Sequence, residues 1–101
     1  MYKLINTTVE NIDEANIIAE HLVSKNISKC TQVIPGVISH YNWNGQLKMD
    51  KECLLIVKVA QRDLEQAILS IESFHSYDTP EIIVSNFDIV GKKYKEWFDG
   101  N

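Results

Sequence analysis

The chain has 101 residues, of which 45% are hydrophobic and 24% charged, and its formal net charge is −4. So short a chain predicts a single domain over residues 1–101, because most of it has to share one core. An acidic balance without a lysine or arginine cluster excludes a protein that neutralises a nucleic-acid backbone, and no apolar run approaches the roughly 18 residues of a membrane span.

The first part of the chain predicts a strand followed by a helix. Residues Tyr2–Thr8 are β-prone and end at a polar turn. Because these residues do not resemble a secretory signal, we expect a cytoplasmic protein. Asn11 is suited to cap the helix, with Glu14 three residues later, and Ile27 is expected to close the core contact. The apolar residues predicted to line the buried face of this helix are Ile12, Ala15, Ala19, Leu22 and Val23.

The middle of the chain predicts a long β-hairpin. Asn44-Gly45 supplies the positive φ angles of a two-residue type I′ turn. Pro35-Gly36 predicts a bulge or bend in the first arm, because proline donates no ladder hydrogen bond. With this turn Cys30 pairs with Val59, six residues from Cys53, or about 20 Å along a strand at ~3.3 Å per residue. A one-residue shift at the bend would not bring the two thiols within disulfide distance.

The last part predicts a helix, a strand and a short tail helix. The second helix runs from Asp63, its expected cap, to Phe74. A strand follows at Glu81–Val84, and its consecutive apolar residues imply burial on both faces. The apolar residues predicted to line one face of the second helix are Leu64, Ala67, Ile68 and Ile71. In the tail helix, Tyr94, Trp97 and Phe98 are predicted to lie on one side.

This order of elements predicts an α+β fold, the ferredoxin-like βαββαβ sandwich with a long hairpin and a C-terminal helix. Both helices cover one face of the sheet in that fold. The run Cys53–Val59 is apolar on both faces: one set of side chains meets the helices, and the other set needs a different cover. The sequence predicts a homo-oligomer built on the uncovered face, with Leu55 and Val57 expected among the side chains that another copy covers.

Four motifs in this order resemble the CutA divalent-cation tolerance protein family. They are VIPGVISHYNWNG at Val33–Gly45, CLLIVK at Cys53–Lys58, HSYDTPEI at His75–Ile82, and the pair Tyr94 and Trp97. The resemblance implies a ferredoxin-like subunit that assembles into a tight homotrimer similar to the PII signalling proteins. It also implies a role in tolerance to copper and other divalent metals.

The resemblance further implies a copper site made of one cysteine and two adjacent histidines. In this chain the cysteine position is Asn6 and the histidine positions are Phe74 and His75. Asparagine binds soft metals poorly and phenylalanine does not bind them. His75 is therefore the one metal ligand predicted here, for copper or another divalent metal. The alternative for His75 is hydrogen bonding that fixes its loop.

The remaining candidate site lies at the clefts between subunits, which are predicted to be lined by Trp43, His75, Tyr77 and Glu81. Of these, Trp43, Tyr77 and Glu81 are expected to contact a small ligand. No motif places a nucleophile beside a base, so we expect no enzymatic activity. The first functional hypothesis is a metal-tolerance protein that acts by binding. The alternative is a PII-like sensor that binds a small anionic or nucleotide ligand and signals to a partner protein.

Overall fold

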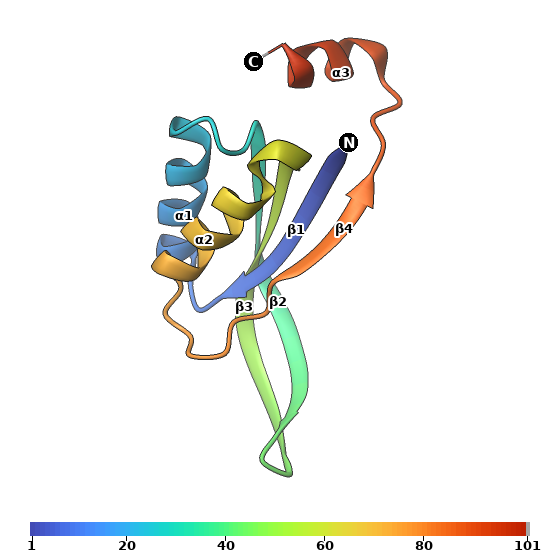
Figure 1. The fold of residues 1–101 in the computed structure, drawn as a ribbon. Helices are drawn as coiled ribbons and strands as arrows, with labels where there is room; N and C mark the ends of the chain where they lie inside the picture. Colours follow the sequence, from blue (N-terminus) through green and yellow to red (C-terminus); the bar gives the residue numbers. More distant parts are fainter. Residues whose placement is uncertain (101) are drawn as a thin grey trace.

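The computed structural model describes residues 1–100, which form a four-stranded antiparallel sheet with strand order β2-β3-β1-β4. Figure 1 shows α1 and α2 on one face of the sheet, α3 at one end, and the distal part of the hairpin projecting from the other end. No helix within residues 1–100 is long and apolar enough to cross a membrane. The elements are β1 (Tyr2–Val9), α1 (Ile12–Ser24), β2 (Cys30–Trp43), β3 (Gln46–Ala60), a short 3-10 helix η1 (Gln61–Asp63), α2 (Leu64–Phe74), β4 (Ile83–Phe87) and α3 (Lys92–Asp99). This order confirms the predicted ferredoxin-like fold.

The core lies between the sheet and the two helices. Side chains alternate along β3, so one set faces the helices and is buried: Cys53, Leu55, Val57 and Val59. Leu54 and Ile56 belong to the other set and remain partly exposed on the face that no helix covers. We call this uncovered surface the open face. The expectation that Leu55 and Val57 lie on the uncovered face was wrong, because both belong to the set that packs against the helices within one chain.

Helix α1 begins as predicted, but its buried face is shifted. The side chain of Asn11 accepts a hydrogen bond from the backbone N–H of Glu14 at 2.9 Å, which confirms the cap. Ile18 is fully buried beside Ala15 and Leu22, whereas Ile12 and Val23 are 43% and 42% exposed. The prediction was wrong for Ile12 and Val23, because these residues lie at the margins of the apolar stripe where the sheet no longer covers them. Ile27 is buried, as expected.

The hairpin confirms the predicted turn and bulge. Asn44 and Gly45 both have positive φ, and Trp43 pairs with Gln46 across the turn. The register shifts by one residue at Pro35-Gly36, so Cys30 pairs with Lys58 and not with Val59. Cys30 and Cys53 are free thiols.

Asp63 occupies the N-cap position of α2, as predicted, but its side chain makes no capping hydrogen bond. A 3-10 turn precedes α2, and the Asp63 carboxylate lies 3.8 Å from Nε of Arg62. The prediction for β4 was wrong. Strand β4 begins at Ile83, two residues later than expected, and Ile83 and Val84 are 54% and 39% exposed. Burial on both faces fails in this chain because β4 is an edge strand that pairs with β1 alone.

Helix α3 closes the end of the sheet opposite the hairpin tip. Phe98 is buried, with its ring 5.4 Å from that of Tyr2, and the Tyr2 hydroxyl donates a hydrogen bond to Asp99 at 2.7 Å. Tyr94 and Trp97 stay partly exposed, and each lies under a lysine ammonium. These cation–π contacts measure 5.1 Å for Lys29 over Trp97 and 5.7 Å for Lys58 over Tyr94.

The buried face of α1 can be tested with two adjacent isoleucines. We expect Ile18→Ala to lower the free energy of unfolding by about 2–5 kcal/mol, because it removes buried contacts and leaves a cavity. Ile17→Ala, at a residue that is 55% exposed, should change it by about 0.5 kcal/mol or less. Urea denaturation followed by circular dichroism measures both values, and equal losses would contradict the assigned face.

Candidate functional site

The loop between α2 and β4 is held in place by His75. The imidazole is fully buried, and its Nε2 lies 2.9 Å from the carbonyl oxygen of Thr8 and 3.2 Å from Oγ1 of Thr7. Its Nδ1 accepts a hydrogen bond from the backbone N–H of Tyr77 at 3.2 Å. A carbonyl oxygen can only accept, so Nε2 carries the proton and the ring is neutral. Both ring nitrogens are therefore engaged in fixing the loop.

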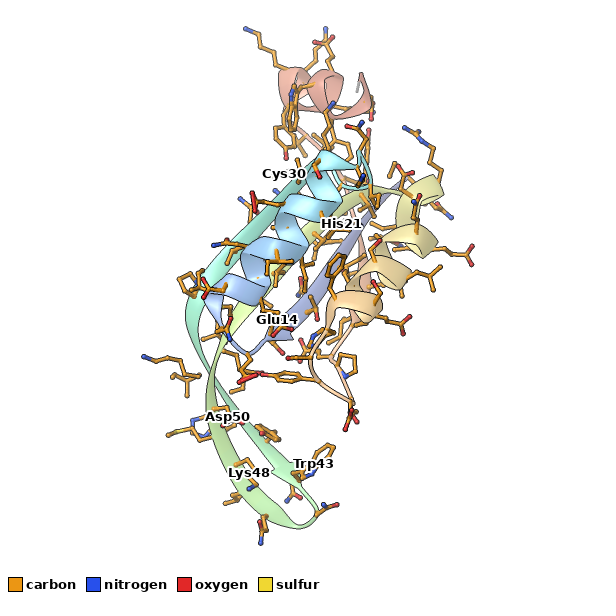
Figure 2. The ribbon with its side chains drawn as sticks, turned by 90° about the vertical axis from the view of Figure 1, so that its left-hand side faces the viewer. Glu14, His21, Cys30, Trp43, Lys48 and Asp50 are labelled. Carbon is orange, nitrogen blue, oxygen red and sulfur yellow. The ribbon has the colours of Figure 1, made fainter. Side chains whose placement is uncertain are left out.

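Helix α1 supplies a second anchor for the same loop. The carboxylate of Glu14 accepts hydrogen bonds from the backbone N–H of Ser76 at 3.0 Å and from its hydroxyl at 2.9 Å. Figure 2 shows Glu14 on α1, on the side that faces this loop. The loop is thus tied to the first helix as well as to β1, which restricts where the side chains that follow can point.

Tyr77 joins the loop to the hairpin. Its ring packs on that of His75, with centroids 5.0 Å apart, and its hydroxyl donates a hydrogen bond to Oε2 of Glu52 on β3 at 2.7 Å. Partial burial, followed by the hydrogen bond to the Glu52 carboxylate, raises the pKa of Tyr77 well above its usual range. The phenol is therefore neutral at physiological pH and acts as a donor.

A cleft of about 490 Å³ lies between the hairpin and this loop. It is lined by all three residues that were predicted to contact a small ligand, Trp43, Tyr77 and Glu81. The structure therefore brings these three side chains together within one chain. The expectation that His75 also lines the cleft was wrong for this chain, because its ring is buried beneath the loop.

The cleft is acidic. Four of its lining residues carry carboxylates, and no lysine or arginine of the described chain lines it: the acidic residues are Asp50, Glu52, Asp78 and Glu81. Tyr41 donates a hydrogen bond to Asp50, and this bond raises the pKa of the Tyr41 phenol. Lys48 pairs with Tyr41 in the hairpin register but does not line the cleft. Trp43, Lys48 and Asp50 can be located on the hairpin in Figure 2.

The copper site that the resemblance implies does not fit these residues. Asn6 pairs with Ile56 and Ile83, so its side chain lies on the open face, whereas His75 bonds the hydroxyl of Thr7, whose side chain is on the helix-covered face. The sheet therefore separates the two positions. Oδ1 of Asn6 is buried without a hydrogen-bond partner. Within residues 1–100 there is no group of three or more His, Cys, Asp or Glu residues placed to hold a metal ion.

The third position of the implied set, Phe74, packs its ring on that of His21 at 4.8 Å and has no ligand atom. The prediction of His75 as a metal ligand stays a prediction. A metal could reach a nitrogen of this ring only after one of the hydrogen bonds that fix the loop had opened.

A chain of Thr7, His75 and Glu14 superficially resembles a nucleophile, a base and an acid. Nε2 of His75 donates to the Thr8 carbonyl, so it cannot also take a proton from the Thr7 hydroxyl. Thr7 is fully buried, so no substrate can approach it. The arrangement stabilises the loop and offers no catalytic geometry.

Sequence reasoning missed Tyr41, Asp50 and Glu52 as members of the site. The available signal was the hairpin register, which places Asp50 and Glu52 on alternate positions of β3, on the same side as each other. Their meeting with Tyr77 depends on the path of the loop after α2, and no sequence pattern describes that path.

The chain is similar to proteins of one family along nearly its whole length. The sequence profile of the CutA1 divalent ion tolerance protein family matches residues 3–101. The chloroplastic protein CutA of Arabidopsis thaliana is 33% identical over 94 residues, which cover 93% of this chain and 52% of that protein, so this chain spans about half the length of that relative. The divalent-cation tolerance protein CutA of Thermus thermophilus is 29% identical over 101 residues, covering 100% of this chain and 98% of that protein.

Solved structures agree with the sequence comparison. The crystal structure of CutA1 from Oryza sativa matches with a TM-score of 0.92 at 29% identity, covering 98% of this chain and 91% of that one. The divalent cation tolerance protein from Thermus thermophilus matches with a TM-score of 0.90 at 28% identity, covering 97% and 95% of the two chains. The ferredoxin-like fold deduced from the residues is the fold of these structures.

The bond between Tyr77 and Glu52 predicts a stability difference that depends on pH. Tyr77→Phe keeps the ring but removes the donor, so at pH 7 it should lower the free energy of unfolding by about 1 kcal/mol. Because folding raises the pKa of Tyr77, this contribution is complete below the unfolded pKa of about 10. It is lost as the pH rises above 10 toward the folded pKa, since the unfolded chain then binds fewer protons than the native one.

Urea titrations of the native chain and Tyr77→Phe between pH 7 and pH 11 measure this difference. Tyr94→Phe is the matched control, because within the described residues the Tyr94 hydroxyl makes no side-chain hydrogen bond. A gap between the native chain and Tyr77→Phe that stays constant across the whole pH range would contradict the assignment.

Proposed function

The chain belongs to the CutA1 divalent ion tolerance protein family, and we propose that it acts in divalent-cation tolerance by binding a cationic ligand in the cleft of Trp43, Tyr77 and Glu81. The observation that carries this proposal is the charge of the cleft, where carboxylates gather without a basic side chain among the described lining residues. A cleft lined by charges of one sign raises the local concentration of ions of the opposite charge.

The same charge argues against the PII-like alternative. A nucleotide or another small anion would bring negative charge beside Asp78 and Glu81, and like charges in a partly dehydrated cleft repel each other. Recognition of phosphate groups relies on arginine, lysine or free backbone N–H groups. The negative charge of the cleft therefore favours a cationic ligand over an anionic one.

We propose binding and not turnover. The phenols in the cleft are fixed as donors to carboxylates, namely Tyr77 to Glu52 and Tyr41 to Asp50. The one hydroxyl beside an imidazole, that of Thr7, is buried in the core. Nothing in this set supports a nucleophile activated by an accessible base.

We also propose that the functional form is a homotrimer whose subunits cover one another's open faces. The support is the amount of apolar surface left uncovered on that face, where Ile34 and Ile83 are 44% and 54% exposed and flank the partly exposed Leu54 and Ile56. On the other side of the projecting hairpin, Leu47 and Met49 are 90% and 64% exposed and offer further apolar surface to a neighbouring subunit. We place the protein in the cytoplasm on the support of its two free thiols.

The assembly is tested by mass. Light scattering of the native chain should give three chain masses. Ile83→Lys should shift the mass toward a single chain, because a charge on the open face cannot be buried without a partner. Leu69→Lys on α2, at a residue that is 66% exposed outside that face, is the matched control and should leave the mass unchanged. A native mass of one chain would overturn the trimer.

The cation preference is tested by calorimetric titration with CuCl₂, MgCl₂ and ATP. We expect weak binding of the cations and no binding of ATP. The double variant Asp78→Asn, Glu81→Gln should weaken cation binding about fivefold, a loss of roughly 1 kcal/mol of Coulomb attraction. His75→Ala, checked by circular dichroism for folding, should not change it. Binding of ATP in preference to the cations would overturn the proposal.

A further inference from the structure

We propose that the ligand of this cleft is an organic ammonium ion, that is, a cation with a hydrocarbon body. This inference rests on the proposed function of cation binding in the cleft. The carrying observation is a combination of aromatic side chains and carboxylates around one cavity. Tyr41 and Trp43 line it from the hairpin, and Tyr77 lines it from the loop. Aromatic faces attract ammonium groups through the ring quadrupole and contact methyl or methylene groups at the same time.

Two of the three rings are held by hydrogen bonds, and the two on the hairpin are partly exposed within one chain. Tyr41 and Trp43 are two residues apart on β2, so both side chains leave the strand on the same side. They are 40% and 50% exposed. The hydroxyl groups of Tyr41 and Tyr77 are bound to Asp50 and Glu52. These bonds orient the rings before a ligand arrives, which reduces the entropy cost of binding.

The chain provides a comparison for what such rings bind. At the opposite end of the sheet, the rings of Trp97, Tyr94 and Tyr2 each lie within 6 Å of a lysine ammonium, with distances of 5.1, 5.7 and 5.9 Å. Within the described residues, no such lysine lies over the rings of the cleft. Within the described chain, those rings therefore carry no cation of the protein's own.

The arrangement of the carboxylates favours a large cation over a bare metal ion. Calcium and magnesium need several oxygen ligands at about 2.0–2.6 Å from one point. Although Asp50, Glu52, Asp78 and Glu81 all line the cleft, no three acidic residues of the described chain converge on such a point. Charges spread around a cavity attract an ion whose own charge is spread over several atoms.

The volume of the cleft agrees with this class of ligand. Cavities that bind small molecules measure about 300–1,000 Å³, and this one measures about 490 Å³. A metal ion would leave most of that space and all three ring faces without a contact. An ammonium ion with several carbon atoms would contact both the rings and the carboxylates.

Choline and its uncharged isostere 3,3-dimethylbutan-1-ol provide a direct test, because they share a shape and differ in charge. The chain has two tryptophans, so Trp97→Phe provides a background in which fluorescence reports Trp43 alone. We expect choline to change this fluorescence and to bind at least about tenfold more tightly than the alcohol. Calorimetry on the native protein should likewise show tighter binding of choline than of the alcohol.

Variants separate the contributions of ring and charge. Trp43→Leu should weaken choline binding about tenfold, because it removes the aromatic ring. Trp43→Phe should weaken it less, because phenylalanine keeps a ring that makes a weaker cation–π contact than tryptophan. Glu81→Gln should weaken it about fivefold. Glu72→Gln, on the exposed surface of α2, is the matched control and should leave it unchanged.

Three outcomes would overturn the inference. Equal binding of choline and the alcohol would show that charge does not matter. Binding of CuCl₂ or MgCl₂ that depends on Glu81, without binding of choline, would leave the proposed function standing and remove the organic ligand. Absence of any binding, together with Trp43 shielded from acrylamide in the native assembly, would show that a second copy fills the cleft.

Discussion

The arrangement of the site depends on a neutral imidazole that bridges two segments of backbone. His75 donates to the carbonyl of Thr8 at the end of β1 and accepts from the N–H of Tyr77, so one ring joins the first strand to the last loop. These bonds fix the direction in which Tyr77 leaves the loop. Tyr77 then reaches Glu52 on the hairpin and forms one wall of the cleft. A buried ring with both nitrogens satisfied holds this geometry without the cost of burying a charge.

The fold could be predicted from the sequence because local signals and the apolar pattern agree. Asn11 caps α1 and Asn44-Gly45 turns the hairpin, both through contacts between near neighbours in the chain. The failures occurred where tertiary context decides. Ile12 and Val23 match the helical period but lie beyond the edge of the sheet, and Ile83 is an apolar residue of an edge strand. Burial at such positions depends on which element packs against them, and the spacing of apolar residues along the chain does not show which element that is.

The lining of the cleft could be anticipated only in part, because it also depends on tertiary context. Trp43, Tyr77 and Glu81 were expected to contact one ligand, and they do line one cleft. The acidic partners from β3 could not be foreseen, because Glu52 meets Tyr77 across 25 positions of sequence through an irregular loop. Membership of the family does not transfer its implied copper ligands to this chain, since the sheet places Asn6 and His75 on opposite faces. The chemistry must therefore be argued from the residues present.

The bulge at Pro35-Gly36 has a consequence for the orientation of the hairpin tip. Val33, before the bulge, pairs with Leu55 and faces the helices, whereas Val37, after it, pairs with Glu52. The extra residue inverts the parity of the strand, so the odd-numbered positions of β2 change sides between its two halves. Tyr41 and Trp43 are odd-numbered, and without this inversion they would project on the side of the helices, away from Glu52. A single inserted residue thus decides whether the aromatic rings and the carboxylates share one side of the ribbon.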